Sequence, residues 1–212
     1  MASIYGEYGP ALRKVMNRLT SELESFNLAH TREHGESLYD HLSGRIKDEE
    51  SMREKLRRRG LEESTRCALR DIQDAVGIRV VCRFIDDVYE TVRLIRGIPG
   101  CTVVLEKDYI RNAKENGYRS YHIILEAETD EPDPEGRTPG RFFAEIQLRT
   151  IAMDTWAALE HELKYKKDLG NMALVGQELR RCANELAACD VSMQTLRRII
   201  RGPEAPGKVN AV

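Results

Sequence analysis

The sequence predicts an α/β (or α+β) fold in which helices flank a central sheet of about five strands. Apolar residues recur at helical spacing in the first and last parts of the chain, whereas the middle holds short segments rich in β-branched residues. Glycine, proline and asparagine separate these segments. The chain has 212 residues, which suits one domain with a helical appendage.

The N-terminal part is predicted to form two helices and a possible third. Residues 8–28 show helical periodicity, carried by Leu12, Val15, Met16, Leu19, Leu23 and Phe26. A second helix is predicted to begin at Asp48, with acids in its first turn, and to stop at Gly60 after a run of arginines. Residues 61–73 suit a third, short helix.

Four strands can be located from β-branched and aromatic residues. They are predicted at residues 77–84, 101–109, 120–128 and 141–150. A helix over residues 86–100 connects the first two. The loop 129–140 contains three prolines and several acids, so we expect it to be mobile and exposed.

The C-terminal part is predicted to be helical over residues 152–167 and 173–201. The last helix carries a near-heptad stripe of Leu179, Cys182, Leu186, Cys189, Met193, Leu196 and Ile200. Such a stripe at the end of a chain more often needs a partner than packs within its own subunit, which favours an oligomer.

Composition excludes several classes of protein. The net charge is −2, whereas a dedicated nucleic-acid binder usually has a basic excess. No apolar run approaches the ~20 residues of a membrane-spanning helix, and no secretory signal is evident. The five cysteines form no CxxC pair, as expected of reduced thiols. We therefore expect a cytoplasmic protein.

Chemistry-bearing residues gather on one predicted strand face. In residues 141–150 the alternation of a strand places Phe143, Glu145, Gln147 and Arg149 on one face, opposite an apolar face. A solvated outer face would explain this row equally well. However, Asp74 stands just before another buried strand, and two carboxylates from separate strands can share a Mg²⁺ ion.

Cations and a loop that contains an aromatic residue supply the other groups that a binding site for a phosphorylated ligand needs. The cations around the second helix are Arg45, Lys47, Lys55 and Arg59. Ser51 and Lys55 are four residues apart, so they share one face of that helix. In the segment "KENGYRSYHIIL" the turn dipeptide Asn116-Gly117 precedes Tyr118 and His122, which suits a planar, phosphorylated ligand.

Four ordered segments resemble one known family. "GRIKDEES", "DAVGIRV", "DYIRNAKENGYRSYH" and "AEIQLRTIAMDTWAALEHELKYK" are similar to the synthetase domain of the RelA/SpoT family, and the chain length resembles its small alarmone synthetases of the RelQ and RelP type. The resemblance implies residues 1–38 as an N-terminal helix, 39–168 as the synthetase domain, 169–202 as an oligomerisation helix and 203–212 as a flexible tail. It also implies a nucleotidyltransferase-like mixed sheet.

The resemblance further implies a reaction and a set of site residues. The β,γ-pyrophosphate of ATP would pass to the ribose 3′-hydroxyl of GDP or GTP, with Mg²⁺ as cofactor. Asp74 would be the principal Mg²⁺ ligand, and Glu145 the general base that also touches metal. Contacts to ATP would come from Arg45, Lys47, Ser51, Lys55 and Arg79, the two arginines sandwiching adenine. Contacts to the acceptor would come from Lys114, Asn116, Tyr118, His122 and Gln147, with Tyr118 stacking on guanine.

Partners and alternatives stay open at this point. The resemblance implies a homotetramer and allows an alarmone or RNA regulator, while the preferred acceptor among GMP, GDP and GTP is not fixed. A toxin-type relative that pyrophosphorylates tRNA or adenosine nucleotides, and a silent nucleotide- or RNA-binding module, are the other functions considered. "HTREH" at residues 30–34 matches an inverted zinc-protease pattern, but no third ligand is evident.

Overall fold

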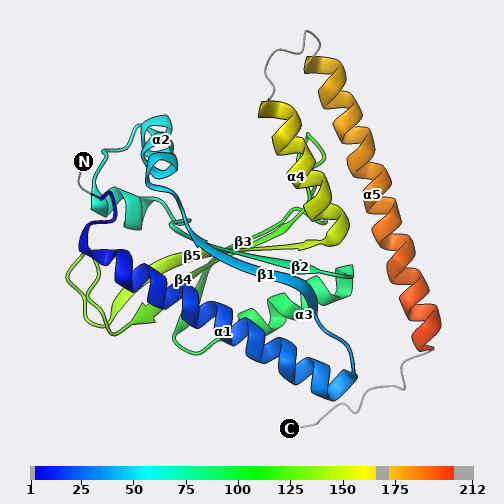
Figure 1. Ribbon diagram of the computed structural model, residues 1–212, viewed down its shortest axis with the longest axis horizontal. Helices are drawn as coiled ribbons and strands as arrows, with labels where there is room; N and C mark the ends of the chain where they lie inside the picture. Colours follow the sequence, from blue (N-terminus) through cyan, green and yellow to red (C-terminus); the bar gives the residue numbers. More distant parts are fainter. Residues whose placement is uncertain (1–2, 166–171, 203–212) are drawn as a thin grey trace.

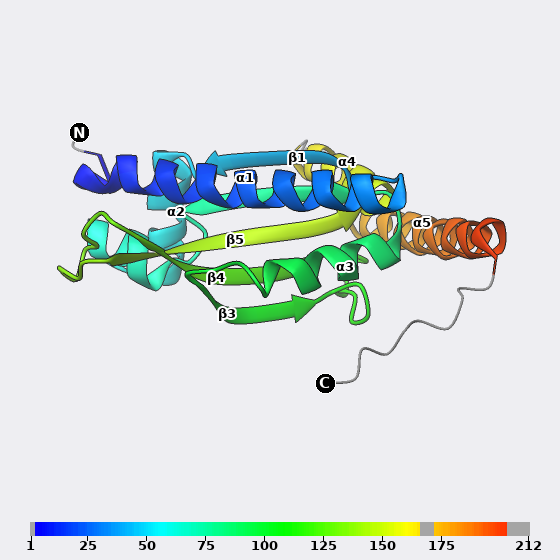
Figure 2. The same cartoon turned by 90° about the horizontal axis from the view of Figure 1, so that it is seen from below.

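The computed structural model describes residues 3–165 and 172–202. It contains one mixed sheet of five strands in the order β1-β2-β5-β4-β3. β2 and β5 are parallel, and the other neighbours are antiparallel. Helices α1 and α3 cover one face of the sheet, whereas α2 and α4 stand over the opposite face at its two ends (Figure 1). Figure 2 shows α1 running lengthwise along the strands, nearly parallel to β1, and α5 extending beyond the sheet.

The elements have the following bounds in chain order. The strands are β1 (Tyr39–Ile46), β2 (Val76–Cys82), β3 (Cys101–Asp108), β4 (Tyr121–Thr129) and β5 (Gly140–Thr150). The helices are α1 (Gly9–His34), α2 (Glu49–Arg59), α3 (Ile85–Ile95), α4 (Ile151–Tyr165) and α5 (Met172–Arg201), with short turns at η1 (Gly6–Tyr8) and η2 (Cys67–Asp71). The predicted fold class is therefore confirmed.

Helix ends follow local chemistry closely. Asp48 caps α2, because its side-chain oxygen accepts hydrogen bonds from two backbone amides of the first turn. Gly60 ends α2 in the left-handed conformation, with φ of 67°. α1 runs six residues beyond the predicted end at residue 28, to His34, and stops at Gly35 with φ of 74°. The third helix expected over residues 61–73 shrinks to the single turn η2.

The strand β1 was not located from the sequence. It lies at the edge of the sheet, and most of its side chains are exposed or half-buried. Its sequence YDHLSGRI therefore lacks the apolar run that marks a central strand. The irregular register between Tyr39 and His41 interrupts its alternation further.

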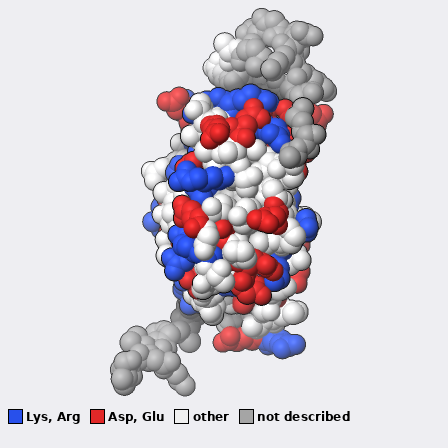
Figure 3. Space-filling view, turned by 90° about the vertical axis from the view of Figure 1, so that its left-hand side faces the viewer, with Lys and Arg blue, Asp and Glu red and all other residues white. Residues whose placement is uncertain are grey.

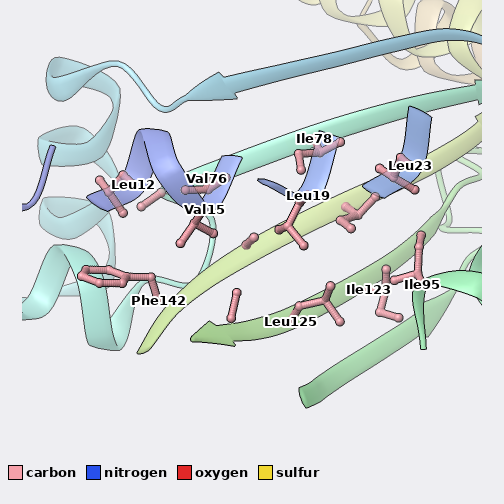
Figure 4. Close-up of a cluster of buried hydrophobic side chains, with 14 of the residues drawn as sticks. Leu12, Val15, Leu19, Leu23, Val76, Ile78, Ile95, Ile123, Leu125 and Phe142 are labelled. Carbon is pink, nitrogen blue, oxygen red and sulfur yellow. The ribbon is translucent and has the colours of Figure 1, made fainter. Parts of the chain in front are cut away.

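The core lies between α1, α3 and the sheet. Figure 4 shows Leu12, Val15, Leu19 and Leu23 of α1 pointing at β2, β4 and β5. The four apolar residues predicted to share one face of β5 are all fully buried: Phe142, Ala144, Ile146 and Leu148. Burying side chains of this size is worth about 1.5–3 kcal/mol each, so this layer holds α1 to the sheet and leaves the opposite face free for polar residues.

The loop between β4 and β5 is largely exposed, as expected, but it has a buried carboxylate at its centre. Asp133 is 1% exposed and organises the loop from its centre. Its carboxylate accepts hydrogen bonds from the backbone amides of Glu135, Arg137 and Arg141 and from the Arg137 side chain. A short loop has no apolar core of its own. The four hydrogen bonds to the buried carboxylate of Asp133 order its backbone instead.

α5 binds the rest of the subunit mainly through polar residues. Asp190, Gln194 and Arg197 are buried on its inner face, where they contact Thr150, Asp86 and Asp87 respectively. The second half of the predicted apolar stripe faces away from the subunit: Cys189, Met193, Leu196 and Ile200 are exposed. No helix in the described ranges is long and apolar enough to cross a membrane. The predicted tail 203–212 lies outside the described residues.

Candidate active site

Two rows of paired residues cross the face of the sheet opposite α1. The first row runs from β1 to β3 through Arg45, Gly77, Glu145, Ile124 and Leu105. The second runs through Ser43, Arg79, Gln147, His122 and Lys107. Strand pairing therefore brings residues from five separate segments into one polar strip, with Glu145 on the central strand.

A cavity of about 280 Å³ opens over β1 and β2; we call it the β1–β2 cavity. It is lined by Ser43, Gly44, Arg45, Lys47, Asp74, Gly77, Ile78, Arg79, Glu145 and Gln147. Arg45 and Arg79 lie diagonally across the pair of strands, because Arg45 pairs with Gly77. Gly77, which lines the same cavity, places no side chain between the two arginines along the diagonal.

Asp74 forms the anionic centre of this cavity. Its Oδ2 lies 2.6 Å from Lys55 Nζ and 3.2 Å from Lys47 Nζ. Its Oδ1 is buried and has no hydrogen-bond partner. A buried carboxylate oxygen without a partner costs free energy unless a ligand satisfies it.

The donor set around this oxygen fits Mg²⁺. Among residues 3–165 and 172–202 there is no group of three or more His, Cys, Asp or Glu side chains that could hold a metal by themselves. Mg²⁺ characteristically takes only one or two protein carboxylates and completes its shell with phosphates and water. Asp74 and Glu145 line the same cavity and supply that number.

Glu145 stands between two cavities and is held on both oxygens. His122 Nδ1 lies 3.0 Å from Oε1, and Gln147 Nε2 donates to Oε2 at 2.8 Å. Burial raises the pKa of the Glu145 carboxyl, but the contacts with His122 and Gln147 outweigh burial and lower that pKa to about 2. The carboxylate is therefore ionised throughout the neutral range. Its contribution to folding stability is present above pH 4.5 and is lost as the pH falls towards 2.

A second cavity of about 190 Å³ opens over β3 and β4; we call it the β3–β4 cavity. It is lined by Leu105, Lys107, Tyr109, Lys114, His122, Ile124 and Glu145. Glu145 thus borders both cavities. Tyr118 stands beside the second cavity, its hydroxyl 2.8 Å from His122 Nε2. The ammonium of Lys114 lies 4.9 Å from the centre of the Tyr118 ring, which brings a cation and an aromatic face together.

The loop that carries Tyr118 is fastened to α5. Asn116 accepts a hydrogen bond from the Tyr118 amide and donates one to Glu160 of α4. Gly117 has φ of 93°, and a Cβ atom there would lie 2.6 Å from Ala183 Cβ of α5. Glycine is therefore required twice, by the backbone conformation and by the close approach of the helix.

Replacing Gly117 by alanine is expected to destabilise the fold and to loosen this loop. Gly136→Ala is the matched control, because Gly136 also has positive φ, at 76°, and has no neighbour within 4 Å of the new Cβ. In both variants alanine is strained by the positive φ, but only in Gly117→Ala does the new Cβ also clash with α5. The free energy of unfolding, measured in urea, should fall by at least about 1 kcal/mol more in Gly117→Ala than in the control. Equal losses would mean that the contact with Ala183 carries no strain.

The structure places the predicted site residues unevenly. Arg45, Lys47, Asp74, Arg79, Glu145 and Gln147 line the β1–β2 cavity, with Lys55 joined to it through Asp74. Lys114 and His122 line the β3–β4 cavity, and Tyr118 and Asn116 adjoin it. Ser51 is exposed on α2, and it lines neither cavity. Gln147 borders the β1–β2 cavity, although the resemblance implied an acceptor contact.

Two residues without an assigned role belong to this network. Arg149 is buried and donates to the Tyr118 hydroxyl at 2.9 Å and to Gln147 Oε1 at 3.1 Å. Asp154 of α4 accepts from Arg149 at 2.9 Å. The alternation that placed Arg149 on the face of Glu145 was the available signal for the first. No pattern pointed to Asp154. The histidines of "HTREH" lie in the last turns of α1, outside both cavities.

Comparison with known proteins gives a single family. A family model described as "Region found in RelA / SpoT proteins" matches residues 44–170. GTP pyrophosphokinase YwaC of Bacillus subtilis is 36% identical over 165 residues, covering 78% of this chain and 77% of the relative. GTP pyrophosphokinase YjbM of the same organism is 30% identical over 193 residues, covering 91% and 88% respectively.

Solved structures agree in fold over nearly the whole chain. Small alarmone synthetase 1 from Bacillus subtilis, bound to its product pppGpp, has a TM-score of 0.78 at 29% identity and covers 90% of this chain and 95% of its own. Small alarmone synthetase 2 from the same organism has a TM-score of 0.75 at 32% identity, covering 88% and 94%.

Proposed function

This chain belongs to the RelA/SpoT family, and from that membership we propose that it is a (p)ppGpp synthetase, a GTP pyrophosphokinase that uses ATP as donor. It transfers the β,γ-pyrophosphate of ATP to the ribose 3′-hydroxyl of GDP or GTP and releases AMP. The observation that carries this proposal is the position of Glu145, which borders both the β1–β2 cavity and the β3–β4 cavity. A transfer between two nucleotides needs one carboxylate at the boundary between their binding sites.

In this proposal ATP occupies the β1–β2 cavity. Its adenine lies between the guanidinium planes of Arg45 and Arg79, since guanidinium groups stack on flat rings as well as attracting phosphate charge. Lys47 and Lys55 face the phosphates, with Ser51 at the start of the same face of α2. The cations offset the phosphate charge, and the Coulomb energy is larger in a partly buried cavity than in water.

The acceptor nucleotide occupies the β3–β4 cavity. Guanine stacks on Tyr118, while Lys114, Asn116 and His122 contact the rest of the nucleotide. Gln147, which borders the β1–β2 cavity, acts through its hydrogen bond to Glu145. The ribose then presents its 3′-hydroxyl to Glu145, which takes the proton as the oxygen bonds to the β-phosphorus. The bond between the β-phosphorus and the oxygen bridging to the α-phosphorus breaks, and AMP leaves with that electron pair.

Asp74 and Glu145, which both line the β1–β2 cavity, would hold Mg²⁺. The ion would neutralise phosphate charge during transfer. The unpartnered Oδ1 of Asp74 supports this assignment, because a bound Mg²⁺ would satisfy this buried anionic oxygen. Lys47 and Lys55 keep the other oxygen of the same carboxylate in place.

A product assay tests this proposal. Purified protein, Mg²⁺ and ATP are offered GMP, GDP, GTP and bulk tRNA in parallel, and the products are separated by anion exchange. AMP release coupled to a 3′-pyrophosphorylated guanine nucleotide is the expected result, and it also ranks the acceptors. AMP release with tRNA alone would overturn it in favour of a toxin-type activity. No AMP in any reaction would favour a silent binding module.

The surface charge lends little support to the tRNA alternative. Arg53 and Arg57 of α2 form ion pairs with acids, Arg53 with Glu63 and Arg57 with Glu50 and Glu63. Figure 3 shows basic and acidic side chains interspersed over the end of the molecule at the left of Figure 1, rather than gathered in a basic patch. Tight RNA binding depends on several uncompensated cations.

Tyr118→Ala is expected to raise the KM for the acceptor by about 5- to 150-fold and to leave the KM for ATP nearly unchanged, because stacking on a base is worth about 1–3 kcal/mol. Tyr118→Phe is the matched control: it keeps the ring and removes the hydroxyl that contacts His122 and Arg149. Steady-state kinetics with each nucleotide varied in turn separates the two constants. An unchanged acceptor KM in Tyr118→Ala would remove Tyr118 from the acceptor site.

We also propose a homotetramer. The second half of α5 exposes Val191, Met193, Leu196, Ile199 and Ile200, each at least 50% accessible in the single chain. An apolar helix face of this length in a subunit otherwise rich in surface charge supports association through α5. Light scattering on the purified protein measures the mass directly, and a monomer would contradict the proposal.

A further inference from the structure

One carboxylate oxygen connects the two cavities. Asp154 Oδ1 lies 2.9 Å from Arg149 Nη1 and 3.6 Å from Arg79 Nη1. Arg79 lines the β1–β2 cavity. Arg149 donates to the hydroxyl of Tyr118, beside the β3–β4 cavity. Asp154 therefore stands between a residue of one cavity and a residue that positions the aromatic ring of the other.

The chain holds Asp154 firmly in this place. α4 follows β5 directly, so Asp154 lies in its first turn, over the ends of β2 and β5. Thr150 accepts a hydrogen bond from the Met153 amide at 3.2 Å, and its hydroxyl donates to Asp190 of α5 at 2.6 Å. These contacts with β5 and α5 fix the start of α4, and with it the backbone of Asp154, before any ligand binds.

Charge balance makes the position of Asp154 matter to both arginines. Arg79 and Arg149 are on the same face of neighbouring parallel strands, and Arg149 is shielded from solvent. Burial and the charge of Arg149 lower the pKa of Arg79, whereas Asp154 raises that pKa. The carboxylate offsets a repulsion that would otherwise push the two guanidinium groups apart.

Arg149 contacts Tyr118, on the acceptor side, in two ways. Its Nη2 donates to the Tyr118 hydroxyl at 2.9 Å and to Gln147 Oε1 at 3.1 Å. Its guanidinium carbon lies 5.3 Å from the centre of the Tyr118 ring. A displacement of Arg149 therefore changes both the hydroxyl contact and the ring face that Tyr118 offers.

We propose that Asp154 is a positioning residue that couples the binding of the two nucleotides, through Arg79 on the ATP side and Arg149 and Tyr118 on the acceptor side. This inference rests on the proposed function, which places adenine against Arg79 and guanine against Tyr118. ATP that stacks on Arg79 fixes the Arg79 side chain. It thereby also fixes the carboxylate of Asp154, which contacts both Arg79 and Arg149. The acceptor then binds a Tyr118 already in place, so each nucleotide tightens the binding of the other.

The test measures four dissociation constants in the full chain by calorimetry with Mg²⁺. GDP is titrated with and without saturating α,β-methylene-ATP, in which a CH₂ group replaces the oxygen that leaves with AMP, and the reverse titrations check reciprocity. In the wild type each ligand should tighten the other by at least about fivefold. Asp154→Asn should reduce this factor to less than about twofold while each ligand alone still binds.

Matched variants separate coupling from folding. Asp40→Asn is the control, because Asp40 also lies 3.6 Å from an arginine, Arg83, but outside both cavities; its coupling factor should equal that of the wild type. Arg149→Lys provides a second route should Asp154→Asn fail to fold, and it should lose the same coupling. The double variant should lose no more than either single variant if both act in one path.

The outcomes distinguish this inference from the function on which it rests. Wild-type coupling below twofold, or a wild-type factor retained in both Asp154→Asn and Arg149→Lys, would overturn the role of Asp154 while AMP production stood. Protein that binds neither nucleotide would contradict the proposed function, and the coupling with it.

Discussion

Glu145→Gln is expected to lower kcat by about 10²- to 10⁴-fold, which is the usual contribution of a general base, with little change in ATP binding. The amide keeps the shape and the hydrogen-bonding positions of the carboxylate but cannot accept the proton of the 3′-hydroxyl. His122 and Gln147 hold both oxygens of the wild-type carboxylate in place, at 3.0 and 2.8 Å, and keep it ionised, so it is able to accept a proton at neutral pH. Single-turnover release of AMP measures the effect, and equilibrium binding of α,β-methylene-ATP measures retention of the donor.

Glu126→Gln is the matched control for this prediction. Glu126 lies on the neighbouring strand and is 18% exposed, as is Glu145. It pairs with Arg70 at 3.1 Å and borders neither cavity. Its loss should therefore cost some stability and almost no activity. A Glu145→Gln protein that turns over at a rate near that of Glu126→Gln would refute the assignment of Glu145 as the base.

The sheet and its polar face could be predicted because local patterns encode them. Strict alternation in β5 separates Phe142 and Ile146, which are fully buried, from Glu145 and Gln147, which line the β1–β2 cavity. The limits of α2 follow from Asp48 and Gly60, whose effects extend over a single turn. Signals of this kind need only neighbours in the sequence.

The strand β1 and the linkage through Asp154 could not be predicted, because both depend on partners far along the chain. β1 takes its place through pairing with β2 and is polar because Ser43 and Arg45 line a cavity. Asp154 acquires its role only when the first turn of α4 meets the ends of β2 and β5. The burial of Asp133 within an otherwise largely exposed loop could likewise not be predicted, since its hydrogen bonds lie within a turn that composition does not reveal.

The outer face of α5 shows a different limit of sequence reasoning. The near-heptad stripe suggested a single apolar seam, but the inner face of the second half of α5 is polar, with Asp190, Gln194 and Arg197 buried. Hydrogen bonds and ion pairs hold this half of the helix to the subunit and leave its apolar residues outside. Periodicity identified the apolar side correctly, whereas the assignment of that side to the subunit core or to a partner required the structure.

Asp74→Asn is expected to weaken the apparent affinity for Mg²⁺ by more than about 10- to 100-fold, the loss typical for residues that only support a ligand, and to lower kcat at a fixed Mg²⁺ concentration. The amide removes the negative charge and replaces one oxygen by a donor. Lys47 and Lys55 then face the cavity without their common counter-ion. Titration of AMP production with Mg²⁺ measures the shift, and rescue at high Mg²⁺ should be incomplete because the geometry of the site is altered.

The control for Asp74→Asn must separate loss of a metal ligand from loss of an ion pair. Asp71→Asn does so, because Asp71 lies three residues earlier and pairs with Arg66 at 3.8 Å on the exposed side of η2. Its Mg²⁺ dependence should equal that of the wild type. A further distinction comes from protein saturated with α,β-methylene-ATP, whose phosphates complete the metal shell: the midpoint of thermal unfolding should rise with Mg²⁺ in the wild type and in Asp71→Asn, but not in Asp74→Asn. Normal Mg²⁺ dependence in Asp74→Asn would instead leave its buried Oδ1 to a water molecule and place the metal elsewhere in the β1–β2 cavity.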